Sequence, residues 1–177
     1  MVILETERLI LRQFEKTDAV AMSGVFGDPD VMRFGPGVQM ADWVSAWIRV
    51  LIEEVYPTRG YGLWAVVEKS QGAFIGYCGL FHFDDLGGQP EIEVGYRLAR
   101  TYWGLGYATE AVCGVRDYAF SKLGITRLVA LIDPQNGASI RVAEKAGMRY
   151  EKDVLLEGYD HPDHLYVISR SQLSIDD

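Results

Sequence analysis

Residues 102–111, with the sequence YWGLGYATEA, have the residue types and spacing of a phosphate-binding turn. They stand between a β-rich run and a strongly helical run. The first N–H groups of a helix lack partners within the helix and lie at the positive end of its dipole, and glycines let an anion approach them closely. We therefore predict that backbone N–H groups here hold phosphate. The residues of this predicted site are Trp103, Gly104, Leu105, Gly106, Tyr107 and Ala108.

Two common phosphate motifs do not fit this turn. The dinucleotide-binding pattern Gly-x-Gly-x-x-Gly requires a third glycine where the chain has Thr109. A P-loop requires Lys-Ser or Lys-Thr after its glycines, and neither pair follows Gly106. Dinucleotide enzymes also usually begin with their βαβ unit, whereas about a hundred residues precede this turn. A nucleotide-binding oxidoreductase is therefore the least favoured alternative.

The composition predicts one folded domain, residues 1–177, since 49% of the residues are hydrophobic and can form a substantial core. The net charge of −8 disfavours a nucleic-acid-binding protein and mildly favours cationic partners such as amines. No apolar run approaches the roughly 18 residues of a membrane span, and the first residues are too charged for a signal peptide. We therefore expect a cytoplasmic location and no membrane partner.

Candidate metal and disulfide ligands are sparse. Cys78 and Cys113 lie far apart in apolar patterns, so we expect two reduced, buried thiols. His161 and His164 lack further ligands at a metal-like spacing, so we expect an ordinary loop there, with contact to a substrate as the alternative. We expect no metal cofactor.

The elements that must position the turn follow from hydrophobic periodicity. Alternating or β-branched runs predict strands at residues 6–13, 61–69, 73–83, 91–98, 127–132, 148–155 and 165–170. Apolar residues at spacings of three and four predict helices at residues 18–26, 43–55, 108–123 and 137–146. Pro57 should end the second helix, and Asn136 should cap the last. The order strand, helix, strand across residues 91–132 predicts a βαβ unit with two parallel strands.

Four motifs together resemble the GNAT superfamily of acetyl-CoA-dependent N-acetyltransferases. The pyrophosphate loop of that family reads Gln/Arg-x-x-Gly-x-Gly/Ala, and residues 103–108 fit its spacing, with Trp103 in place of the usual Gln or Arg. This tryptophan and the motifs at residues 4–12, 93–96 and 136–148 are similar to the RimJ/RimL branch. The resemblance spans essentially the whole chain. It implies an α/β (α+β mixed) three-layer fold, whose central mixed, twisted sheet of about six to seven strands has helices on both faces and a splayed parallel strand pair.

The resemblance implies acetyl-CoA as co-substrate. Its pantetheine arm would lie along residues 91–98, held by backbone groups around Tyr96 and Leu98, while the glycine turn holds the pyrophosphate. An anionic protein can bind this anionic molecule because the dipoles that matter are local. Arg100, Arg141 and Lys145 are candidate phosphate contacts, although a solvated surface position is the favoured interpretation for each.

Family members transfer acetyl directly to an amine, which requires a base. Glu93, which matches the family's Glu-x-Gly-Tyr, is the predicted base, acting directly or through a water. Glu91 shares its strand face and is the reserve. The alternative is that both carboxylates are solvated or pair with Arg97 or Arg100.

The departing thiolate requires an acid. Many superfamily members use a tyrosine seven residues after the asparagine that begins the last helix, but Ala143 stands there. Ser139 is the predicted substitute, and Asn136 would orient the cofactor amide or a water, while helix capping is the alternative role of both. A backbone N–H near residues 94–96 would stabilise the oxyanion, with a β-bulge at Gly95.

The predicted function is acetyl transfer to a primary amine, with a protein or peptide N-terminal α-amine as the favoured acceptor. Polyamines and aminoglycosides are alternatives, as is a non-catalytic CoA-binding module. The protein could be a monomer or a homodimer. Acidic loop residues could attract a basic acceptor, and several aromatic residues could line its pocket, although core positions are favoured for the aromatic ones. The acidic residues are Asp84, Asp85, Asp160 and Asp163, and the aromatic ones are Phe34, Trp43, Trp47, Trp64, Phe81 and Phe83.

Overall fold

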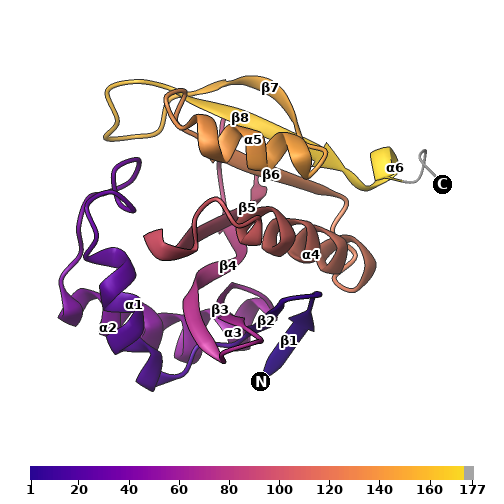
Figure 1. Cartoon of the computed structure of the whole chain (residues 1–177). Coiled ribbons are helices and arrows are strands. Elements are labelled where there is room, and N and C mark those ends of the chain that lie inside the picture. Colours follow the sequence, from indigo (N-terminus) through magenta and orange to yellow (C-terminus); the bar gives the residue numbers. More distant parts are fainter. Residues whose placement is uncertain (174–177) are drawn as a thin grey trace.

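The structure, a computed structural model, describes residues 1–173. Residues 174–177, which the predicted domain includes, lie outside the described residues. One eight-stranded sheet has the order β1-β2-β3-β4-β5-β6-β8-β7 (Figure 1). Only β5 and β6 are parallel neighbours within the described part of the chain. The strands are β1 (Val2–Glu5), β2 (Leu9–Arg12), β3 (Leu63–Glu68), β4 (Ala73–Phe83), β5 (Glu91–Leu98), β6 (Arg127–Ile132), β7 (Arg149–Val154) and β8 (Asp163–Ser169).

Helices cover both faces of the sheet. The α-helices are α1 (Ala19–Phe26), α2 (Ala41–Val50), α3 (Tyr56–Arg59), α4 (Tyr107–Ser121), α5 (Gly137–Lys145) and α6 (Arg170–Leu173). Tyr77 of β4 packs against Phe26 of α1. Its neighbour Cys78, which points to the opposite face, pairs in register with Trp64 of β3, and the Trp64 ring meets Tyr118 of α4. Thus α1 and α2 cover one face, and α4, with α5 beside it, covers the other (Figure 1).

The parallel strands β5 and β6 meet at one point and then separate. Glu93 pairs with Val129, and this is their single matched pair in the described residues. By contrast, β5 is in register with β4 at every position from Glu91 to Leu98. Beyond Glu93, backbone groups on the facing edges of β5 and β6 therefore lack strand partners. This is the splayed parallel pair that the family resemblance predicted.

The elements next to this gap match the sequence-based predictions closely. The predicted ranges 73–83, 91–98 and 127–132 coincide with β4, β5 and β6, and the helix predicted from residue 108 begins at Tyr107. The βαβ unit β5-α4-β6 is also confirmed. These segments are bounded by glycine, proline or acidic turns, which makes their ends visible in the sequence.

The N-terminal strand was predicted wrongly. Two antiparallel strands, β1 and β2, replace the single strand expected at residues 6–13, so the sheet has eight strands instead of about six to seven. The turn between them is closed by a 2.9 Å bond from the Thr6 N–H to the Leu9 carbonyl. Glu110 of α4 also holds it, accepting bonds from the Thr6 hydroxyl at 2.6 Å and from the Arg8 N–H at 2.7 Å. Because Glu110 lies about a hundred residues away in the sequence, no local pattern predicts this turn.

Pro57 does not end the second helix as predicted. The helix α2 continues through a π-helical segment, η2 (Leu51–Val55), into α3, where Pro57 lies in the first turn. Pro57 donates no N–H to this continuous helix, and it directly follows the π-helical segment, where the hydrogen bonds depart from the regular α-helical spacing. The chain leaves the helix at Gly60 instead, whose φ of +72° is left-handed.

The remaining expectations concern membranes and cysteines. Within residues 1–173, no helix has the length and apolarity that crossing a membrane requires. Both cysteines are free thiols; Cys78 is buried, whereas Cys113 is only partly so.

Candidate active site

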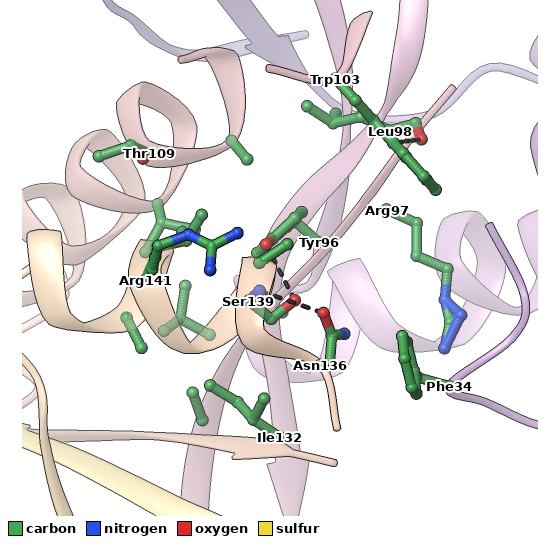
Figure 2. A pocket seen from close by; sticks show the side chains of 18 of the residues that line it. Phe34, Tyr96, Arg97, Leu98, Trp103, Thr109, Ile132, Asn136, Ser139 and Arg141 are labelled. Carbon is green, nitrogen blue, oxygen red and sulfur yellow. Dashed lines mark hydrogen bonds between the residues drawn. The ribbon is translucent and has the colours of Figure 1, made fainter. Parts of the chain in front are cut away.

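A cavity of about 600 Å³ lies where β5 and β6 separate (Figure 2). Its walls come from β5, β6, the starts of α4 and α5, and the loop between α1 and α2. It brings together nearly all predicted site residues, namely Glu93, Tyr96, Leu98, Trp103, Gly104, Gly106, Tyr107, Ala108, Asn136 and Ser139. Leu105 is the exception, since its side chain is 54% exposed and does not line the cavity.

The glycine turn has the backbone conformation of an anion site. Gly104 and Gly106 have φ values of +74° and +83°, which glycine adopts without strain. Gly106 caps α4 without a side chain, so the first N–H groups of the helix receive no side-chain acceptor. Trp103 is different, because its N–H donates to the Arg100 carbonyl at 3.1 Å and its indole Nε1 donates to the Leu98 carbonyl at 2.8 Å. The N–H groups open to a phosphate therefore start at Gly104.

An ion pair missed by sequence reasoning braces this turn. The Arg8 guanidinium donates to Glu110 at 2.6 Å and to the Leu105 carbonyl at 2.9 Å, and it lies 4.4 Å from the centre of the Tyr107 ring. These contacts lower the pKa of Glu110 against the effect of burial, through bonds from Thr6 and Arg8. The signal lay in two motifs already noted, residues 4–12 and 102–111, whose contact only the fold reveals.

Glu93 lies in the gap between the strands. Its side chain is half-buried, and its Oε1 accepts a 3.2 Å hydrogen bond from the Leu131 N–H of β6. Burial raises the pKa of Glu93 from 4.5 to about 7; the Leu131 bond and Arg97 lower it, and Asp163 raises it further. A carboxyl with such a pKa exchanges protons readily near neutral pH.

Glu91, the reserve base, does not line the cavity. It is 4% exposed and accepts hydrogen bonds from Gln89 at 2.6 Å and from Arg127 at 3.0 Å. Its role is therefore structural, as one alternative proposed, but its partner is Arg127 rather than Arg97 or Arg100.

The three candidate phosphate contacts differ in position. Arg100 pairs with Asp28 and Asp30 and lies outside the cavity lining, whereas Arg141 and Lys145 line the cavity.

Three polar side chains form a chain of contacts opposite the glycine turn (Figure 2). The Tyr96 hydroxyl lies 3.0 Å from Ser139 Oγ, and either atom can be the donor. Asn136 caps α5, since its Oδ1 accepts a 3.1 Å bond from the Ser139 N–H. Burial raises the pKa of Tyr96, and the bond with Ser139 lowers it. The sequence indicated the backbone around Tyr96 as a cofactor contact, but it indicated no part for the Tyr96 hydroxyl in the reaction.

The β-bulge expected at Gly95 is absent from the described pairing of β5 with β4, which continues through Gly95 without a shift. Alternate N–H groups of β5 still point towards the gap, where they have no strand partner. An N–H group from residues 94–96 thus remains the predicted oxyanion donor.

The core positions favoured for the aromatic residues are wrong for Trp43 and Phe81, which are 43% and 46% exposed. Trp43 and Trp47 pack with Phe26 in the cluster formed by α1 and α2, Trp64 is buried, and Phe81 and Phe83 pack together outside the cavity. Phe34 alone of the six candidates lines the cavity.

Two acidic residues, Asp133 and Asp163, line the cavity near Glu93. His161 lies within 4.8 Å of both, a grouping that sequence spacing did not reveal. It contacts Asp133 at 3.0 Å and Asp160 at 2.7 Å. His164 contacts Asp153 at 2.7 Å instead. The two histidines therefore lie beside carboxylates, and only His161 is near the cavity.

These features fit acetyl-CoA. The cavity volume lies within the range of cofactor sites. Uncapped N–H groups at α4 suit the pyrophosphate, unpaired strand edges suit the amide groups of pantetheine, and Arg141 and Lys145 supply positive charge on the same side. A Cβ at Gly106 would lie 3.3 Å from the Arg8 guanidinium, so glycine lets the main chain of the turn pass close to this side chain.

Comparison with known proteins agrees with this geometry. Residues 8–149 match the family described as acetyltransferase (GNAT) domain. The chain is 40% identical over 154 residues to YkkB of Bacillus subtilis (strain 168), covering 85% of this chain and 87% of that protein. It is 32% identical over 161 residues to the N-acetyltransferase p20 of Bacillus licheniformis, covering 90% and 88%. A GNAT-family acetyltransferase from Bacillus anthracis has a similar structure, with a TM-score of 0.80, 27% identity and coverage of 97% and 99%. The chain therefore belongs to the GNAT acetyltransferase family and is an acetyl-CoA-dependent acyltransferase.

Proposed function

We propose that this enzyme acetylates a primary α-amine, with Glu93 as the base that removes the ammonium proton. The single observation that carries the proposal is the position of Glu93, in the strand gap with a pKa raised to about 7. An α-ammonium group with pKa about 7.8 loses its proton to such a base far more readily than a lysine ammonium with pKa about 10.4. The structure thus favours an α-amine over a lysine side chain.

The proposed reaction passes one proton to the departing sulfur and releases one to solvent. Bound acetyl-CoA supplies the acetyl thioester. Glu93 takes the first proton from the ammonium group and gives it up to solvent, and it accepts a second, either directly or through a water, as the N–C bond forms. With the Tyr96 hydroxyl as donor, one of the two directions that its 3.0 Å contact with Ser139 Oγ allows, Ser139 gives its own proton to the departing sulfur as the C–S bond breaks. The proton held by Glu93 then returns to the hydroxyl pair through water, so that CoA leaves as the thiol. Asn136 fixes this arrangement by holding the Ser139 N–H, and its amide group is available to the cofactor.

The RimJ/RimL branch remains part of the proposal. Trp103, the residue by which the turn departs from the general family pattern, has a defined role here, since its indole fixes the end of β5 through Leu98. The contact of Ser139 with Tyr96 supports the serine as a replacement for the missing tyrosine at Ala143. The protein N-terminus is the acceptor that this branch implies.

Thiol release from acetyl-CoA tests the proposal. We expect turnover with peptides or other compounds that carry a free α-amine, and little with amines of higher pKa. Glu93→Gln should lower kcat by about 10²- to 10⁴-fold at pH 7, with acetyl-CoA affinity retained. The matched control, Glu91→Gln, should lower stability and leave the turnover of the folded enzyme unchanged. Tight CoA binding without turnover of any amine would favour the non-catalytic module.

A further inference from the structure

We infer that Arg97 binds a carboxylate of the acceptor, so that the substrate is a small zwitterion such as a short peptide. The inference rests on the proposed transfer to an amine at Glu93 and specifies the chemical class of that amine. It follows from the surroundings of one guanidinium group in the cavity wall.

Arg97 is half-buried, lines the cavity and has no carboxylate within 4.0 Å among residues 1–173. Its one side-chain hydrogen bond in that part of the chain goes to Met32 Sδ at 3.4 Å. A thioether is a weak acceptor, and a guanidinium has five N–H donors. Arg12 and Arg127, also partly buried, each bind carboxylates at 3.0 Å or less. Arg97 therefore differs from them in keeping donors free for a ligand.

The strand places Arg97 on the same side as the proposed base. Residues 93, 95 and 97 of β5 point to one face, because side chains alternate along a strand. Gly95 leaves the space between the two charged side chains open, since a Cβ built there would have its nearest contacts 4.0 Å away, at the Glu93 carboxyl group. About 13 Å separates the Cα atoms of Glu93 and Arg97, and the charge of Arg97 is near enough to lower the pKa of Glu93. A small molecule can therefore contact both groups.

The guanidinium packs against the loop between α1 and α2. Gly35 of this loop lies so close that a Cβ there would meet Arg97 Nη2. The ring of Phe34 lines the cavity near Arg97, on the side away from Arg141 in the view of Figure 2. Arg33, the cation of the loop itself, is exposed and lies 5.1 Å from the centre of the Phe34 ring. The Arg97 group is thus held at the acceptor end, opposite the phosphate side.

Negative and positive side chains lie near one another in the part of the cavity where the acceptor would bind. Glu93, Asp133 and Asp163 lie together at the strand gap and suit the ammonium group. Asp30 does not neutralise Arg97, since its carboxylate binds Arg100 at 2.8 Å. An acceptor with an ammonium and a carboxylate complements both signs, whereas a polyamine would place a cation beside Arg97.

Matched acceptor pairs test this inference. We would compare kcat/KM for dialanine with its amide, and for trialanine with its amide, in thiol-release assays. The amine of each amide is less basic, so amine reactivity alone favours the amide. We expect the wild-type enzyme to prefer the carboxylate member by at least about 10-fold, as for a charge-assisted hydrogen bond. Equal rates, or preference for the amides, would overturn the inference.

Two variants assign the preference to Arg97. Arg97→Met should abolish it by slowing the carboxylate member alone, while the exposed Arg149→Gln on β7 should retain it. Retained preference in a folded Arg97→Met enzyme would also overturn the inference, and if that variant does not fold, the wild-type pairs decide. If no amine is acetylated, the proposed transfer fails. Calorimetric binding of dialanine and its amide to the enzyme–CoA complex then still decides the role of Arg97, since weaker binding of dialanine would contradict it.

Discussion

The Glu93 carboxylate accepts a hydrogen bond from the Leu131 N–H, at 3.2 Å, across the gap between β5 and β6. In a continuous parallel pair, a backbone carbonyl would take that N–H. Because the strands separate, the Glu93 carboxylate accepts this hydrogen bond in place of a backbone carbonyl. Because burial outweighs this bond, the pKa of Glu93 still rises to about 7. One structural feature therefore both opens the cofactor cleft and sets the pKa of the proposed base.

The first prediction concerns stability. The pKa of Glu93 is about 7 in the folded protein and near 4.5 in the unfolded chain, so the folded state binds more protons between these values. The contribution of this group is therefore fully present below pH 4.5 and is lost as the pH rises through 7. Glu93→Gln should raise the free energy of unfolding at pH 8 relative to the wild type, by at most about 3 kcal/mol.

Denaturant unfolding at pH 4.5 and pH 8 measures this difference. The advantage of the Gln variant should be largest at pH 8 and should shrink towards pH 4.5. A variant whose advantage does not change with pH would show that Glu93 titrates normally.

The second prediction concerns the hydroxyl pair. Tyr96→Phe removes the partner that orients Ser139, so we expect kcat to fall by about 10- to 100-fold with the acetyl-CoA dissociation constant little changed. Ser139→Ala should lower kcat at least as much. Steady-state kinetics with one acceptor measures both variants, and a Ser139→Ala enzyme of full activity would exclude the serine as proton donor.

The third prediction concerns the glycine turn. Gly106→Ala places a side chain at φ +83°, close to the Arg8 guanidinium, which strains the turn by about 1–2 kcal/mol and should weaken acetyl-CoA binding by about 10-fold. Gly124→Ala, at φ +68° beyond the other end of α4, is the matched control. It should lower stability similarly and leave acetyl-CoA affinity unchanged. Equal affinity losses in both variants would mean that the turn does not contact the cofactor.

The fourth prediction concerns the brace beneath that turn. Glu110→Gln weakens the bonds that Arg8 and Thr6 make to the start of α4. Because charged hydrogen bonds contribute about 1.5–3 kcal/mol, we expect a lower midpoint of thermal unfolding and weaker acetyl-CoA binding. Calorimetry of both quantities checks it, and an unchanged affinity would limit the brace to a structural role.

The sequence predicted the strands around the cavity better than the N-terminal strand pair, for physical reasons. The strands β4 to β6 are long, apolar runs between turn residues, and the glycines of the turn adopt left-handed backbone conformations. Local sequence patterns are therefore enough to predict these elements. The hairpin of β1 and β2 depends on Glu110, which no local pattern encodes.

Side-chain partners were the least predictable part of the site. Glu91 and Glu93 share a strand face, yet Arg127 neutralises the first and the open gap leaves the second free. Their spacing along the chain gives no reason to assign the two carboxylates different roles. Only the arrangement of β6 beside β5 distinguishes a structural carboxylate from a candidate base.

The pH dependence of acetyl transfer tests the central claim most directly. With an α-amine acceptor, kcat/KM of the wild-type enzyme should rise with pH through an apparent pKa of about 7, the value raised by burial of Glu93. In Glu93→Gln that rise should move to the pKa of the free amine, about 7.8, and the rate at pH 7 should fall by at least about 100-fold. A Glu93→Gln enzyme that keeps both the wild-type rate and the wild-type profile from pH 6 to 9 would contradict the account.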